Sequence, residues 1–146
     1  NDQYDAVVSW LALYHIPKRD KLLETCMNIL KPKGYFFAED FAFHQPFNEN
    51  EKKELSKDFF ANYIVSYSEY RHDLVKAGFS EIVVDDMTAS WSNFTKSRYA
   101  AYRDNIERHT RVHNEAVVEN MLYFYSFAMR YLDGGKLGGI RVSAKK

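Results

Sequence analysis

Apolar and polar positions along the chain alternate with two periods, one typical of strands and the other of helices. The run Tyr4–Ser9 is short, apolar and rich in β-branched residues, which is typical of a strand inside a parallel sheet. From Arg19 to Leu30, apolar residues recur at helical spacing, and Pro32 and Gly34 predict the end of that helix. A second buried strand is expected over residues 34–40. This succession of strand, helix and strand predicts a βαβ unit with parallel strands and a right-handed crossover.

The remainder of the chain continues to alternate between helical and strand-like patterns. Further helices are expected over residues 51–63, 66–77, 89–113 and 115–132, and further strands over 80–87 and 139–144. No linker or internal repeat separates these segments, so we expect a single domain over residues 1–146. The alternation predicts an α/β fold.

Composition and charge exclude several classes of protein. A hydrophobic fraction of 46% supplies enough apolar surface for a core, which a disordered chain lacks. The net charge is +0, whereas a protein that binds nucleic-acid backbones needs a basic surplus, so no nucleic-acid partner is expected. Every apolar run is shorter than the roughly 18 residues of a membrane span, so no membrane insertion is expected. Cys26 is the only cysteine, which excludes a disulfide framework and a multi-cysteine zinc site. No signal-peptide pattern is evident in the sequence, so a cytoplasmic location is expected.

Candidate chemistry gathers after the first two predicted strands. In an open α/β sheet, ligands bind beyond the carboxyl ends of the strands. His15 follows the first strand and is the best candidate for a general base, because imidazole ordinarily titrates near neutrality. A loop histidine that contacts only solvent is the alternative. Glu39 and Asp40 end the second strand, where they can hold a substrate amine or hydroxyl, or can be solvated loop acids.

Two further motifs carry weaker signals. His109 and His113 are one helical turn apart, which is a metal-ligand spacing. No third ligand is evident, so two exposed histidines are favoured and no metal is expected. The glycines at 134–139 follow a helix rather than a strand, which does not fit a phosphate-binding loop.

Together these segments resemble the C-terminal half of a class I S-adenosylmethionine-dependent methyltransferase. The resemblance lies in the first strand, in Leu30-Lys31-Pro32-Lys33-Gly34, and in the following strand that ends at Asp40. Over the whole chain it is similar to phosphoethanolamine and sarcosine/dimethylglycine N-methyltransferases. The resemblance implies a partial Rossmann-like sheet with strands four to seven of the family in the order 4-5-7-6. It also implies an antiparallel last strand and a helical insertion on the substrate side.

The same resemblance implies transfer of a methyl group from S-adenosylmethionine to a small-molecule acceptor, with nitrogen as the expected atom. Ser9 and Trp10 match positions that approach the cofactor, and His15 matches a catalytic histidine. The implied substrate-binding positions are Leu11, Asp40, Phe41 and Tyr63. Two of these depart from the family pattern, because Leu11 replaces an acid and Phe41 replaces a tyrosine. A basic residue that would hold a substrate phosphate is also missing from residues 59–63.

The family's glycine-rich loop and the acid that binds the cofactor ribose have no counterpart in this sequence. The chain is therefore expected to be part of a longer methyltransferase and to be inactive alone. A non-catalytic assembly or binding module built on the same half-sheet is the alternative, and a nucleotide-dependent oxidoreductase is less favoured. Without its neighbour in the parent sheet, the strand at residues 4–9 would be an open edge, which predicts a homodimer through that edge.

Overall fold

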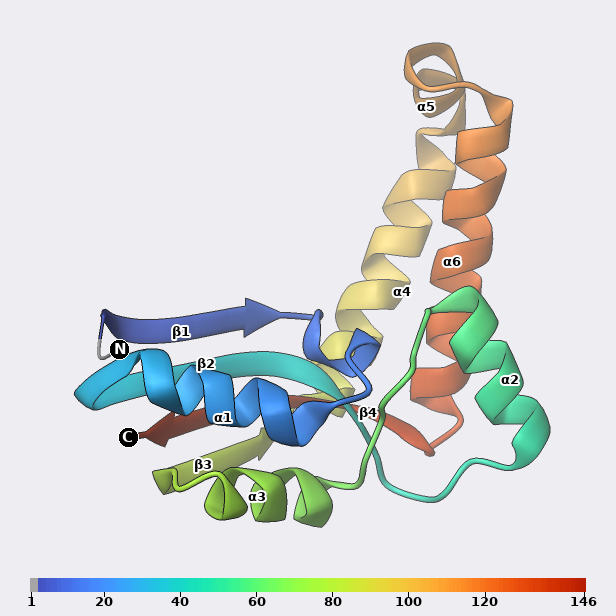
Figure 1. The fold of residues 1–146 in the computed structure, drawn as a ribbon. Coiled ribbons are helices and arrows are strands. Elements are labelled where there is room, and N and C mark those ends of the chain that lie inside the picture. The colour runs from blue at the N-terminus through green and yellow to red at the C-terminus, as the bar shows by residue number, and fades with distance from the viewer. Residues whose placement is uncertain (1–2) are drawn as a thin grey trace.

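The computed structural model describes residues 3–146, which form a four-stranded sheet and a set of helices (Figure 1). The strands are β1 (Tyr4–Trp10), β2 (Leu30–Phe43), β3 (Ser80–Asp86) and β4 (Leu137–Lys145). They lie in the order β1-β2-β4-β3. Strands β1 and β2 are parallel, whereas β4 is antiparallel to both of its neighbours. This confirms the predicted α/β half-sheet, including its strand order and its antiparallel last strand.

Seven helical segments lie in the described chain, and most of them either cover the sheet or form a projecting arm (Figure 1). They are η1 (Leu13–His15), α1 (Arg19–Ile29), α2 (Glu49–Asp58), α3 (Tyr67–Lys76), α4 (Thr88–Asp104), α5 (Ile106–Val112) and α6 (Glu115–Asp133). Helices α1 and α3 cover one face of the sheet, while α4 and α6 form an arm that projects away from it, with α5 at the tip (Figure 1). Helix α2 lies beside the part of α6 nearest the sheet (Figure 1).

Two apolar clusters hold these layers together. The first fills the space between the sheet and helices α1 and α3, where Leu23, Phe36, Leu74 and Ile140 are fully buried. The second cluster joins the arm to the sheet and includes Phe41, Phe59, Phe127 and Leu137. Burial of such side chains contributes roughly 1.5–3 kcal/mol each relative to exposure.

The opposite face of the sheet is open at β1 and β2. Tyr35 is 57% exposed and Val8 is 47% exposed, although both belong to strands. In Figure 1 the helices α1 and α3 lie on the other side of these strands. The apolar side chains of Val8 and Tyr35 are therefore left uncovered by α1 and α3.

Three predicted boundaries need correction. The second strand begins at Leu30, directly after α1, and the pairing of β1 with β2 shifts between Tyr4 and Ala6 to accommodate residues 31–34. The helix predicted over 51–63 ends at Asp58. The helix predicted over 89–113 is interrupted at Asn105, where the side-chain amide donates to the carbonyl of Ala101 at 2.9 Å. Asparagine competes with the helical backbone for hydrogen bonds, which explains the break.

Candidate functional site

The candidate site lies beyond the carboxyl ends of β1 and β2. The chain turns sharply after β1, and the Leu11 N–H donates to the Glu39 carbonyl at 2.8 Å. Leu11 has φ +48 and Phe60, on the loop opposite, has φ +52. Non-glycine residues rarely adopt this left-handed conformation, which Lys33, Glu81 and Asn114 also adopt elsewhere in the chain.

The loop at residues 59–63 fixes the backbone of η1. The N–H groups of Asn62 and Tyr63 both donate to the Tyr14 carbonyl, at 3.0 and 2.8 Å. The Asn62 side-chain amide also donates to the His15 carbonyl at 3.0 Å. Because α2 ends before this loop, these groups are free to bind η1, and they set the position of His15.

The hydrogen-bond partner of His15 determines which tautomer its ring adopts in the neutral form. Its Nδ1 lies 2.9 Å from the Phe60 carbonyl oxygen, which can only accept a hydrogen bond. The proton of the neutral ring is therefore on Nδ1, and Nε2 carries the lone pair. The ring packs on Tyr14 at a centroid distance of 3.9 Å. His15 thus presents Nε2 as an acceptor from an oriented, half-buried ring.

Asp40 is enclosed beneath η1 and has no surface left for a substrate. Its carboxylate is fully buried and accepts hydrogen bonds from both terminal nitrogens of Arg19, each at 3.2 Å. The Tyr70 hydroxyl and the Tyr14 N–H also donate to it, at 3.2 and 3.1 Å. Burial raises the pKa of Asp40, against the opposing effect of Arg19. Asp40 was predicted to contact the substrate, but its carboxylate is fully buried and instead connects β2 to η1 by accepting from the Tyr14 N–H.

Arg19 was not predicted as part of the site. Its side chain is 2% exposed and lies between the rings of Tyr63 and Tyr70, at 5.2 and 4.8 Å from their centroids. Its Nε is buried without a hydrogen-bond partner in the described chain. A signal was available in the sequence, since Arg19 shares its helical face with Leu23 and Cys26, which are buried.

A cluster of aromatic side chains packs against Tyr14. Phe41 contacts Tyr14 and Trp91 edge to face, at 5.0 and 5.6 Å, and stacks on Phe59 at 5.6 Å. Phe41 is 8% exposed, so it shapes the site from within. Among the described ring contacts, Tyr14 connects Phe41 with His15, and Tyr14 was not among the predicted site residues.

The predicted cofactor-side residues form an open wall. Ser9 is half-buried, whereas Trp10 is 66% exposed and contacts Phe37 edge to face at 6.4 Å. Leu11 is 43% exposed beside them. Trp10, Leu11 and His15 lie on one short segment of the chain. Within this segment, the ring of Trp10 packs on Phe37 and not on His15.

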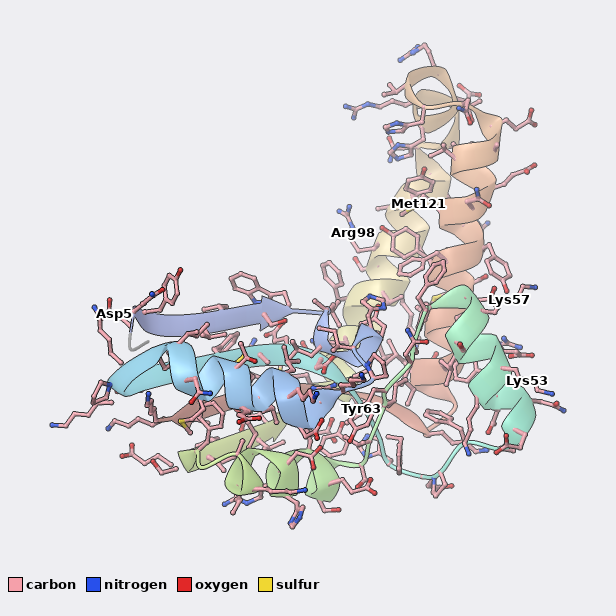
Figure 2. All side chains as sticks on the ribbon, viewed as in Figure 1. Asp5, Lys53, Lys57, Tyr63, Arg98 and Met121 are labelled. Carbon is pink, nitrogen blue, oxygen red and sulfur yellow. The ribbon has the colours of Figure 1, made fainter. Side chains whose placement is uncertain are left out.

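Tyr63 and Glu39 point elsewhere. The Tyr63 hydroxyl donates to Asp73 at 3.3 Å, and the ring lines a cavity of about 620 Å³ between α1 and α3, near the start of α1 (Figure 2). Glu39 forms an ion pair with Arg141 at 2.6 Å on the sheet. Neither side chain is brought to His15 by the contacts of the described residues.

His109 and His113 lie near the tip of the arm. Within residues 3–146, no group of three His, Cys, Asp or Glu side chains is placed to hold a metal ion. In the same part of the chain, no helix combines the length and the apolar character needed to cross a membrane.

Comparisons with known proteins identify the architecture. Residues 1–38 match the methyltransferase domain family. Phosphoethanolamine N-methyltransferase 2 of Haemonchus contortus, solved with phosphomonomethylethanolamine and S-adenosylhomocysteine, superposes with a TM-score of 0.91 at 19% identity, over 99% of this chain and 34% of that one. The chain has a methyltransferase fold. A search of curated proteins gives no match.

Two other solved structures share this methyltransferase fold. A protein assigned as a sarcosine dimethylglycine methyltransferase, from Galdieria sulphuraria, has a TM-score of 0.86 at 17% identity, over 100% of this chain and 54% of that one. A cyclopropane synthase of Mycobacterium tuberculosis has a TM-score of 0.83 at 14% identity, over 100% of this chain and 56% of that one. The chain thus spans between about a third and just over half of the length of these structures.

Proposed function

We propose that the chain is the substrate-side part of a methyltransferase that transfers a methyl group from S-adenosylmethionine to a small molecule, with nitrogen as the acceptor atom. The observation that carries the proposal is His15. Within a methyltransferase fold, its Nε2 lone pair is presented beyond the strand ends, where ligands of open α/β sheets bind. The Haemonchus enzyme, solved with a phosphobase and S-adenosylhomocysteine, supports the cofactor and the acceptor class.

The residues of this chain fit one side of such a cofactor. Ser9 and Trp10 end β1, and the exposed Trp10 indole offers a flat apolar surface next to a hydroxyl. The glycine-rich turn and the ribose-binding acid of the family are not among the residues of the chain. When bound, S-adenosylmethionine supplies an electrophilic methyl group. The proposed enzyme therefore needs a further segment to complete the cofactor site.

The chain's own residues supply proton handling and a dry surface. His15 Nε2 accepts the proton that an acceptor amine loses, and the Phe60 carbonyl, bonded to Nδ1–H, stabilises the resulting imidazolium. Tyr14 and Phe41 exclude water behind the imidazole. Burial raises the pKa of Tyr14 to about 12, with Asp40 adding to the effect, so the phenol stays protonated at neutral pH.

The test is the variant His15→Ala in a longer, active protein that contains this chain. General-base catalysis contributes about 10²–10⁴-fold, so we expect kcat to fall by about 10²-fold or more with little change in Tm. Added imidazole should restore part of the activity. His72→Ala is the matched control, because His72 is an exposed histidine on α3. An unchanged kcat for His15→Ala would contradict the assignment.

The alternative is a non-catalytic module built on the same half-sheet. Leu11 favours it, because this aliphatic side chain is 43% exposed at a position where the resemblance to N-methyltransferases implies an acid for the substrate amine. A longer protein that binds S-adenosylmethionine but shows no turnover on any amine would support this alternative. For either function we propose a cytoplasmic location, since Cys26 is buried and forms no disulfide.

We also propose that the chain forms a homodimer through β1. In residues 3–146, β1 pairs on one side only, with β2. The unpaired edges of β1 in two copies of the chain can pair antiparallel across a two-fold axis. The exposed Val8 side chain of each copy would then be covered by the other copy. Val8→Lys should shift sedimentation at micromolar concentration toward monomer, while Val75→Lys on α3, where Val75 is 56% exposed, should not. A wild-type chain that sediments as a monomer would refute the edge pairing.

A further inference from the structure

The arm carries a second cavity that is separate from the site at His15. It has a volume of about 350 Å³ and lies between α4, α5 and α6. Figure 1 shows this part of the arm projecting away from the sheet, and Figure 2 shows Arg98 on α4 and Met121 on α6 at that level. Helix α5 has no buried residue. The distal arm therefore contributes little to the core, and its lining calls for another explanation.

The lining of this arm cavity is positively charged. Arg98 and Arg108 line it together with His109 and His113, and no carboxylate is among its lining residues. Asp104 and Glu107 are neighbours in sequence but do not line the cavity. This concentration of cationic and imidazole groups contrasts with the net charge of +0 of the chain.

The two guanidinium groups also lack carboxylate partners. Arg19, Arg130 and Arg141 each form an ion pair with a carboxylate at 3.2 Å or less. In residues 3–146, no ion pair involves Arg98 or Arg108. A guanidinium presents several N–H donors in a planar fork that matches an oxyanion. Both forks are thus available to an external acceptor.

Aromatic contacts orient the imidazoles at this cavity. Tyr102 stacks on His109 with a centroid distance of 4.0 Å and an interplanar angle of 6°. His113 lies 6.4 Å further on with its ring tilted by 15° from that of His109. On the other side, Tyr125 contacts Tyr102 at 6.0 Å. The stack fixes the planes of the imidazole rings, so that their N–H edges are held rather than free to rotate.

We propose that the arm cavity binds an oxyanion, namely the phosphate group of a small phosphomonoester. The two guanidinium groups supply charge-assisted hydrogen bonds, and the imidazole edges add donors on the α5 side. A concave space of about 350 Å³ suits a small molecule better than a polymer backbone, which binds along an extended basic stripe. This site does not depend on methyl transfer at His15.

The experiment is a phosphate titration of the wild-type chain followed by NMR, at constant ionic strength with chloride as the replaced ion. Saturable shifts of the Arg98, Arg108, His109 and His113 signals are expected. A hydrogen bond to a charged group contributes about 1.5–3 kcal/mol, so Arg98→Gln and Arg108→Gln should each weaken binding by about tenfold or more. Arg111→Gln is the matched control, because Arg111 is also on α5 but does not line the cavity, and it should change binding less than about twofold.

Three outcomes would overturn the proposal. Shifts that do not saturate would mean general screening of charge. Equal losses in Arg111→Gln and Arg98→Gln would mean that the charge of the whole tip, not the cavity, attracts the anion. Binding of a heparin oligosaccharide without binding of inorganic phosphate would assign the surface to a polyanion instead.

Discussion

Replacing Asp40 by asparagine should destabilise the protein strongly. The change removes the only carboxylate that contacts Arg19 in the described chain, and the side chain of Arg19 is 2% exposed. Breaking a buried ion pair by removing one partner costs about 3–5 kcal/mol, because the other charge is left uncompensated. For a chain of this size, 1 kcal/mol corresponds to about 2–4 °C, so Tm should fall by about 10 °C.

Urea unfolding followed by circular dichroism measures this effect, and two variants sharpen it. Asp5→Asn removes the ion pair between Asp5 and Lys31, in which the Asp5 side chain is 87% exposed. This change should lower the free energy of unfolding by less than about 1 kcal/mol. The double variant Asp40→Leu/Arg19→Met replaces the buried pair by apolar groups and should recover part of the loss. A free energy of unfolding for Asp40→Asn within about 1 kcal/mol of wild type would refute the reasoning.

Two further predictions concern stability. Hydrogen bonds from the Lys136 ammonium and, to a smaller extent, from the Asn48 N–H lower the pKa of Glu51. Ionised Glu51 therefore stabilises the folded state above about pH 4.3, and this contribution is lost as the pH falls through the lowered pKa. Glu51→Gln should therefore flatten the fall in stability between about pH 5 and 3, as followed by urea midpoints, and an unchanged pH profile would contradict this. A Cβ on Gly139 would clash with the Trp91 ring, so Gly139→Ala should cost about 1–3 kcal/mol by the same assay. A neutral effect there would show that Trp91 can move without cost.

The sheet was predictable because each strand has a strong local signal. The β-branched run at 4–9 and the alternating run at 139–144 fix two strands, and the helical spacing at 19–30 places a crossover between the first two. Segment ends were less predictable. Pro32 and Gly34 indicate the end of a helix, but they lie inside β2, because a register shift in the pairing with β1 accommodates them.

The position of His15 in the fold was predictable, but its contacts were not. His15 follows a strand end, and this position is readable from the sequence. The tautomer of His15 depends on Phe60, which is distant in sequence and belongs to a loop that was predicted as helix. The role of Asp40 depends on Arg19 in the same way. Helical spacing places Arg19 on the buried face of α1, but it does not show which carboxylate Arg19 pairs with.

Calorimetric titration with S-adenosylmethionine tests the central claim most directly. It compares the chain of 146 residues with a longer protein in which the chain is joined to a glycine-rich, cofactor-binding segment. We expect micromolar binding to the longer protein and no measurable binding to the chain alone, because Ser9 and Trp10, the cofactor contacts that we propose for this chain, would form only one wall of that site. Micromolar binding to the chain alone, or no binding to either protein, would contradict it.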